Sequence, residues 1–137
     1  MSNQTYEMSV RVQPQDVDGL NHVNNIVYLR WVQDVAIAHW RAIAPPEDQA
    51  ELIWVVHRHE IDYLSPAFPN DELILHTRVG DAVGLRFERL TEILRAGDCK
   101  VLAKARTLWV PADPKSGRPK RVSAAVRDLF SAGQPDV

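Results

Sequence analysis

The sequence predicts one α+β domain, spanning residues 1–137, in which an antiparallel sheet wraps around a long buried helix. Its 137 residues, 45% of them hydrophobic and 25% charged, are enough for one globular core. The apolar pattern runs in the order strand, helix and four strands, with a short helix at the C-terminal end. That order is typical of an α+β domain, and a sheet wrapped around the helix is the simplest way to bury it.

The first strand is expected at residues 6–13, where apolar and polar side chains alternate and one face meets water. Residues 14–25 follow with a proline, a glycine, three asparagines and two aspartates, so they are predicted to form a loop.

A long helix is predicted between Val23 and Ala44. Its polar side chains fall in one stripe about 100° wide when successive residues are placed about 100° apart; they are Arg30, Gln33, Asp34 and Arg41. The remaining circumference is mostly apolar, which is typical of a helix enclosed by other structure. Pro45 and Pro46 are expected to end it.

Four further strands are predicted between prolines, glycines and aspartates, at residues 52–64, 72–81, 85–94 and 100–110. Their connections are short, so an antiparallel meander is expected. Ala103 and Ala105 in the last strand would let a helix approach closely. Ser123 is placed as the N-cap of a short terminal helix that reaches Phe130.

Charge, cysteine content and hydropathy exclude several classes of protein. The net charge of −2 gives no electrostatic reason to bind nucleic acid. Cys99 is the only cysteine, so an internal disulfide and a zinc site of several thiolates are both impossible. No segment approaches the ~18 apolar residues of a membrane span, and residues 1–7 have no basic region followed by an apolar run. We therefore expect a cytoplasmic protein.

The loop Asp16–Asn25 gathers two carboxylates, a histidine and several amides directly before the helix. The unpaired N–H groups and the dipole of a helix N-terminus favour negative charge there. Hydrolysis of a thioester requires a group that attacks or activates water, and donors for the oxyanion, which a carboxylate and a helix N-terminus supply. The same residue types also dominate turns and N-caps, and their spacing alone leaves both interpretations open.

Three parts of the sequence resemble the 4-hydroxybenzoyl-CoA thioesterase-like family of hotdog enzymes: Asp16–Asn25 with Tyr28–Trp31, Glu60–Ala67, and Asn70–Leu73. The first carries the family's signature, and the other two resemble its second strand and the turn that follows. Asn21–Asn25 is also similar to the corresponding segment of acyl-carrier-protein thioesterases. The resemblance extends from about Val10 to Val110.

The resemblance implies a hotdog fold, in which a five-stranded antiparallel sheet wraps around a long central helix. It implies a homodimer or a dimer of dimers, with the active site at the dimer interface. The implied substrate is an acyl-CoA, or the same acyl group on a carrier protein. Neither a metal nor a separate cofactor is implied, because coenzyme A is part of the substrate.

By position, the resemblance assigns catalysis to Asp18, as nucleophile or general base, and a supporting role to Asp16. The backbone N–H of Asn25 would polarise the thioester carbonyl, with Asn24 and Val23 as further contributors.

His22 would orient the catalytic aspartate, assist proton transfer or hydrogen-bond the substrate. Similar carrier-protein thioesterases use a histidine at this point. Their asparagine two residues after the aspartate is Leu20 here, so His22 is assigned a secondary role.

Two histidines and the cysteine are further candidates outside the loop. His57 and His59 lie two apart on a predicted strand, hence on one face, and they are expected to line the substrate pocket or to form ordinary hydrogen bonds. A metal site there would need a third ligand, which no motif supplies. Cys99 is interpreted as a small buried hydrophobe and not as a nucleophile.

Basic residues offer candidate contacts for the phosphates of coenzyme A, because guanidinium and ammonium groups suit phosphate oxygens. They are Arg86, Arg89, Arg118, Lys120 and Arg121, and solvated surface charge is the alternative interpretation of each.

These observations together predict an acyl-CoA thioesterase without a metal. Two alternatives come from other classes: a hotdog hydratase or dehydratase that acts on enoyl thioesters, and a non-catalytic module that binds acyl-CoA. The aromatic side chains are expected in the core or in the walls of an acyl pocket; they are Tyr28, Trp31, Trp40 and Trp109.

Overall fold

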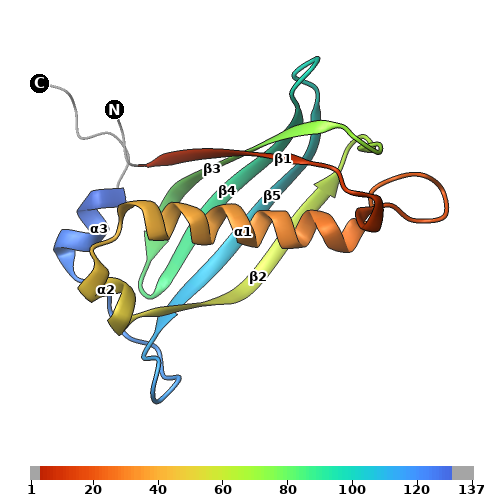
Figure 1. Cartoon of the computed structure of the whole chain (residues 1–137). Helices are drawn as coiled ribbons and strands as arrows, with labels where there is room; N and C mark the ends of the chain where they lie inside the picture. The colour runs from red at the N-terminus through yellow and green to blue at the C-terminus, as the bar shows by residue number, and fades with distance from the viewer. Residues whose placement is uncertain (1–3, 131–137) are drawn as a thin grey trace, which may run out of the picture.

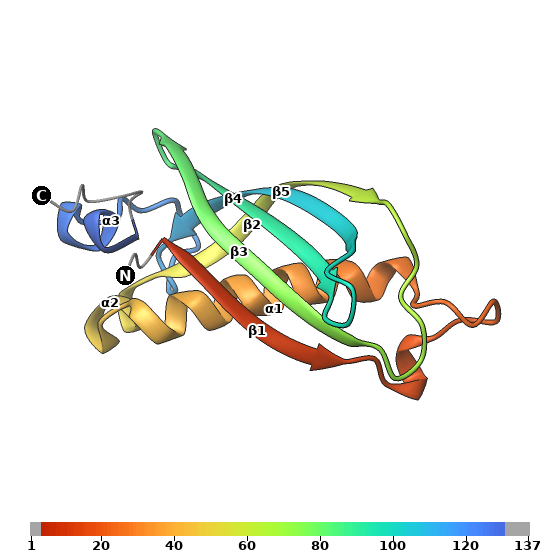
Figure 2. The same cartoon turned by 90° about the horizontal axis from the view of Figure 1, so that it is seen from above.

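The computed structural model describes residues 4–130 and contains a five-stranded sheet. The long helix lies across this sheet (Figure 1). The sheet contains β1 (Thr5–Arg11), β2 (Ile53–Tyr63), β3 (Glu72–Val83), β4 (Arg86–Arg95) and β5 (Val101–Ala112). Their order is β1-β3-β4-β5-β2, and every neighbouring pair is antiparallel. Seen from above, the strands cross over helix α1 (Asn25–Ile43) and wrap around it (Figure 2). This is the hotdog fold that the sequence resemblance implied.

The predicted meander is correct for β3, β4 and β5 and wrong for β2. β2 pairs with β5 at the far edge of the sheet and not with β3, which follows it in the chain. The connection from β2 to β3 instead runs past the start of α1, where Val23 donates a backbone hydrogen bond to Ala67. Two prolines in this connection, Pro66 and Pro69, prevent the tight hairpin that a meander requires.

Helix α1 begins at an asparagine cap and buries one face. The Asn24 side chain accepts a hydrogen bond from the N–H of Ile26, and Pro45 stands just beyond the end of the helix. The buried residues repeat at three- and four-residue spacing: Val27, Tyr28, Trp31, Val32, Val35, Ala36 and His39. The prediction that the helix is enclosed on all its apolar sides is wrong for the single chain, because Ile26 is 71% exposed and Ile37 is 39% exposed.

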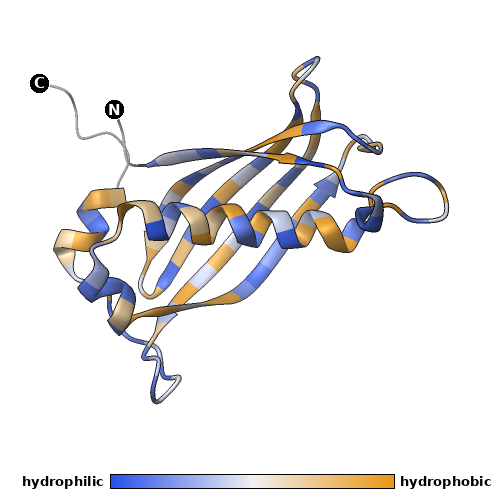
Figure 3. Cartoon of the chain, viewed as in Figure 1, coloured by the Kyte–Doolittle hydropathy of each residue, from blue (hydrophilic) through white to orange (hydrophobic). Residues whose placement is uncertain are grey.

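The core has two parts along α1. The first half of the helix packs on the inward residues of β3, β4 and β5, where Ala103 and Ala105 allow the close approach that was predicted. The alternation of apolar and polar residues that produces this face is visible along the strands in Figure 3. The second half packs against a separate cluster that includes Leu52, Val126 and Phe130.

Short helices lie near the C-terminal end of α1 (Figure 1). α3 (Ala124–Phe130) confirms the predicted terminal helix, and Val126 donates its backbone N–H to the Ser123 hydroxyl. α2 (Pro46–Glu51) was not predicted, although Pro46 at its first position is favourable for a helix start. No helix within residues 4–130 is long and apolar enough to cross a membrane.

A bulge in β2 overturns the prediction that His57 and His59 share a face. The register against β5 shifts between Val56 and Arg58, so the side-chain alternation reverses at this point. His57 is exposed, whereas His59 is half-buried beneath α1.

The interpretation of Cys99 as a buried hydrophobe is also wrong. Cys99 is exposed, lies in the turn before β5 and has a φ of 58°. The strand therefore starts one residue later than predicted, because the chain must first leave this left-handed turn.

Candidate active site

A cavity of about 450 Å³ opens at the N-terminal end of α1. It is bounded by the loop before the helix, by the first turn of the helix and by the end of β2. The sequence candidates in its wall are Asp18, His22, Val23, Asn24 and Asn25. The structure thus brings together the residues that the family signature selected, with the exception of Asp16.

The loop is held as a narrow turn. Val17 and Val23 form an isolated antiparallel bridge, and the Asp18 N–H donates to the carbonyl of His22 at 2.8 Å. Asn21 closes the turn with a φ of 64°, a conformation that asparagine tolerates better than most residues. Asp18 and His22 therefore stand opposite each other where the turn begins and ends.

Asp18 is exposed, and within residues 4–130 only one of its carboxylate oxygens accepts hydrogen bonds. Oδ1 accepts the N–H of Leu20 at 2.9 Å and that of His22 at 3.4 Å. These hydrogen bonds are those of an ordinary aspartate turn, which is the alternative that the residue types of the loop left open. Oδ2 receives no hydrogen bond from the residues that the structure describes, and it remains available to a substrate or to water.

Asp16 lies behind the loop and not in the cavity. It is 3% exposed, its Oδ1 accepts a hydrogen bond from Arg30 at 3.1 Å, and its Oδ2 accepts the N–H of Gln13 at 2.9 Å. Its carbonyl accepts the N–H of Asn24. Asp16 therefore fixes the loop to the helix and does not face the reacting groups.

The backbone amides at the helix start differ in availability. The N–H of Val23 bonds to Ala67, that of Asn24 to Asp16, and that of Ile26 to the Asn24 side chain. Among the described residues, no acceptor bonds to the N–H of Asn25. The geometry thus leaves Asn25 as the free donor and occupies the amides of Val23 and Asn24, which were the further candidates.

Two tyrosines complete the wall of the cavity. Tyr63 at the end of β2 lines it and donates its hydroxyl to the Asn25 carbonyl at 3.3 Å. Tyr28 lines its floor, its hydroxyl accepts the N–H of Ala67, and burial raises its pKa. The His22 ring packs edge-on against Phe68. Tyr28 was expected in the core or in the wall of an acyl pocket, whereas Tyr63 and Phe68 are marked only by their position in the folded chain.

The remaining candidates lie outside this cavity. His59 contacts Gln33 at 3.3 Å and Thr107 at 2.9 Å beneath the helix, where burial lowers its pKa. Arg86 and Arg118 are exposed elsewhere on the chain, and Lys120 approaches Glu51.

Within residues 4–130, no three histidine, cysteine, aspartate or glutamate side chains converge in a group that would hold a metal ion. The cavity at the helix start offers a carboxylate oxygen, a free backbone donor and a histidine ring. These are the groups of an acyl-transfer site that uses acid–base and hydrogen-bond chemistry.

Residues 12–130 match the thioesterase-like superfamily. Among curated proteins, none matches this chain in sequence.

Solved structures share the fold over most of their length. A thioesterase from Thermus thermophilus, solved in complex with coenzyme A and zinc, is 27% identical, with a TM-score of 0.78 over 92% of this chain and 97% of its own. A probable thioesterase from Bartonella henselae is 23% identical, with a TM-score of 0.76 over 87% of this chain and 99% of its own. A 1,4-dihydroxy-2-naphthoyl-CoA thioesterase from Synechocystis is 18% identical, with a TM-score of 0.78 over 92% and 95% of the two chains.

Proposed function

This chain belongs to the thioesterase-like superfamily, and from that premise we propose that it hydrolyses acyl thioesters of coenzyme A with Asp18 as its catalytic carboxylate. The family and the similar structures support a thioester hydrolase in general. The single observation that carries the finer proposal is the pairing in one cavity of two groups without partners in the described chain. They are Oδ2 of Asp18 and the N–H of Asn25.

Asp18 supplies the base or the nucleophile. As general base, its Oδ2 takes a proton from water while the water oxygen adds to the thioester carbonyl; as nucleophile, it adds to the carbonyl itself and water then cleaves the anhydride. The bonds from Leu20 and His22 to Oδ1 hold the carboxylate in place without occupying Oδ2.

Asn25 stabilises the charge that develops on the carbonyl oxygen. Its N–H stands at the positive end of a 19-residue helix, where the backbone dipoles favour an anion. The tetrahedral intermediate collapses with cleavage of the carbon–sulfur bond, and the thiolate of coenzyme A takes up a proton. The products are a free carboxylic acid and a thiol.

The test is release of thiol from a panel of aliphatic and aromatic acyl-CoAs, measured for the wild type and for Asp18→Asn. Asparagine retains an Oδ1 that accepts the turn hydrogen bonds, so the loop should persist while kcat falls at least about 100-fold. Asp113→Asn is the matched control, because the Oδ1 of Asp113 accepts two backbone N–H groups in a similar turn outside the cavity. Its activity should equal that of the wild type.

Three outcomes would contradict the proposal. Full activity of Asp18→Asn would remove the carboxylate from the mechanism. Binding of acyl-CoA by the wild type without release of any thiol would favour the binding module. Hydration of an enoyl-CoA in preference to hydrolysis would favour the hydratase.

We also propose that the chain works as a homodimer or a dimer of dimers. Large apolar side chains are exposed on α1 and on β2, which is an edge strand of the sheet; they are Ile26, Ile37, Ile53 and Val55. Sedimentation velocity should show at least a dimer, and Val55→Lys should shift it towards the monomer, because an edge lysine opposes strand pairing. Val83→Lys, in the exposed end of β3, is the control. A wild-type chain that is monomeric at all concentrations would contradict this proposal.

A further inference from the structure

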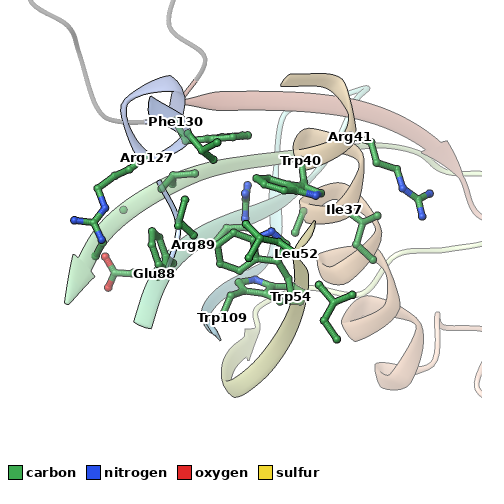
Figure 4. Close-up of a pocket in the computed structure, with 18 of the residues that line it drawn as sticks. Ile37, Trp40, Arg41, Leu52, Trp54, Glu88, Arg89, Trp109, Arg127 and Phe130 are labelled. Carbon is green, nitrogen blue, oxygen red and sulfur yellow. The ribbon is translucent and has the colours of Figure 1, made fainter. Parts of the chain in front are cut away.

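A second and larger cavity, of about 770 Å³, lies at the C-terminal half of α1. Figure 4 shows side chains of α1, α3 and the strands gathered around it. Its volume falls within the roughly 300–1,000 Å³ typical of small-molecule sites. None of the residues that line it also lines the cavity of Asp18. The two cavities lie at opposite ends of α1. The 19 residues of this helix span roughly 28 Å.

Aromatic rings that pack on one another form much of the wall of this cavity. Trp40 meets Trp54 edge-on with ring centroids 5.4 Å apart, and Trp54 meets Phe87 in the same way at 5.2 Å. Phe130 of α3 stacks on Trp40 at 5.6 Å. Such pairs are rigid walls for an apolar ligand.

Arg89 brings a positive charge into this apolar wall. It lines the cavity from β4, and burial lowers its pKa to about 10. It forms no ion pair with any carboxylate of residues 4–130. Neither of the two carboxylates beside the cavity pairs with Arg89, since Glu88 pairs with Arg106 and Asp81 is exposed.

The hydrogen bonds of Arg89 leave one edge of the guanidinium open. Nη1 contacts Nδ1 of His39 at 2.9 Å and the Thr77 hydroxyl at 3.2 Å, which accounts for both of its protons. Because arginine can only donate, Nδ1 of His39 is the acceptor in this contact. Nε and Nη2 bond to nothing in the part of the chain that the structure describes. That edge is the one that binds a carboxylate through two parallel hydrogen bonds.

The wall of the cavity holds further hydrogen-bond donors. The indole Nε1 atoms of Trp54 and Trp109 are buried, and neither has a hydrogen-bond partner in residues 4–130. Buried donors are usually satisfied in native proteins, so orphaned donors in a cavity wall indicate a missing acceptor. Two further arginines, Arg41 and Arg127, line the same cavity.

We propose that this cavity is a second ligand site, which binds a free carboxylic acid with an apolar body and places its carboxylate on the Nε–Nη2 edge of Arg89. The apolar body packs on the rings of Trp40, Trp54 and Phe87. The ligand belongs to the same chemical class as the acid that thioester hydrolysis releases, but its binding does not depend on hydrolysis.

The test is a titration with decanoate and, separately, with decan-1-ol, which has the same carbon chain and no charge. Intrinsic fluorescence reports binding, because three of the four tryptophans line the cavity, and calorimetry gives the affinity. The wild type should bind decanoate more tightly than the alcohol. Arg89→Met should weaken decanoate binding about 10- to 100-fold. Arg78→Met removes an exposed arginine of the neighbouring strand β3 that lines neither cavity, and it should change decanoate binding little.

Asp18→Asn separates this site from the proposed catalytic one, because it should bind decanoate as the wild type does. Equal affinities of the wild type for decanoate and decan-1-ol would overturn the proposal, and this comparison holds even if Arg89→Met fails to fold. The proposal would also be overturned if the wild type did not bind decanoate. Unchanged decanoate binding by Arg89→Met, or loss of binding in Asp18→Asn, would overturn it in the same way.

Discussion

Nη2 of Arg30 lies 3.1 Å from Oδ1 of Asp16, and this ion pair joins helix α1 to the loop that carries Asp18. The aspartate is almost fully buried, whereas the arginine is half-exposed. The other oxygen of Asp16 accepts the N–H of Gln13, at the start of the loop. One carboxylate therefore connects the start of the loop to the helix. The position of the catalytic candidate thus depends on a residue that does not face the cavity.

Replacement of Asp16 should therefore loosen the loop. Asp16→Asn removes the charge that Arg30 pairs with, and we expect a loss of about 1–2 kcal/mol in the free energy of unfolding, since the arginine remains partly solvated. Urea unfolding measures this loss. Asp34→Asn is the control, because Asp34 is 4.0 Å from the same arginine on the exposed side of the helix and should cost less than about 0.5 kcal/mol. Equal losses in the two variants would contradict a special role for Asp16.

Alternation and turn residues predicted the strands to within a few residues, because local periodicity reflects which face each side chain buries. The place of β2 beside β5 was not predictable in this way, since pairing joins Ile53 to Ala112, which local patterns do not connect. The bulge after Val56 is equally invisible, because one extra residue leaves the apolar alternation intact on each side. The exposed face of α1 was misjudged because its apolar residues have no cover in the single chain.

His59 should make stability depend on pH. Burial lowers its pKa below the usual value of 6.5, so the unfolded chain takes up a proton at a higher pH than the folded chain does. Stability should therefore fall as the pH drops from about 6.5 through the pKa of the folded state. Urea unfolding between pH 7.5 and pH 5 measures this decline, which His59→Gln should reduce.

His57→Gln serves as the control for this pH dependence. His57 stands two residues away on the same strand but is exposed at the bulge, and it lacks the burial that acts on His59. The variant should keep the decline of the wild type. If His59→Gln and His57→Gln showed the same profile, burial of His59 would not be its cause.

The cap of α3 should contribute measurably to stability. The Ser123 hydroxyl accepts the N–H of Val126, and α3 in turn carries Phe130 into the aromatic wall of the larger cavity. Ser123→Ala should lower the free energy of unfolding by about 1 kcal/mol, whereas Ser123→Asp retains an acceptor and should stay near the wild type. Thermal unfolding of the three proteins measures both values. An alanine variant as stable as the wild type would show that α3 is held by its packing alone.

The chemical groups of the candidate site could be predicted from the sequence, because the carboxylates, the histidine and the helix start are contiguous from Asp16 to Asn25. The choice between the two aspartates came only from the family resemblance, which assigned catalysis to Asp18, since Asp16 and Asp18 have the same side chain and their different burial is a property of the folded chain. The resemblance likewise named the Asn25 amide first, but the sequence could not show that the amide of Val23 is occupied, because its acceptor is the carbonyl of Ala67, far along the chain. The cavity of Arg89 combines residues of several elements, so no single segment signals it.

Removal of one N–H should reveal the oxyanion donor. Asn25 is the first residue of α1, a position where proline is well tolerated because its missing N–H has no partner within the helix. The preceding residue, Asn24, already has the extended conformation that a following proline requires, with φ of −64° and ψ of 138°. Asn25→Pro should therefore fold like the wild type and lower kcat about 100- to 1,000-fold.

Asn25→Ala separates the amide from the side chain, because it retains the N–H and removes only the carboxamide. If the backbone donates to the oxyanion, the alanine variant keeps most of the activity while the proline variant loses it. The KM values of both should change little, since the donor acts on charge that is fully developed only in the transition state. A proline variant with the kcat of the wild type would remove the Asn25 amide from the mechanism, and so would an alanine variant as impaired as the proline variant. The Asp18 carboxylate would then lack the oxyanion donor that this proposal pairs with it.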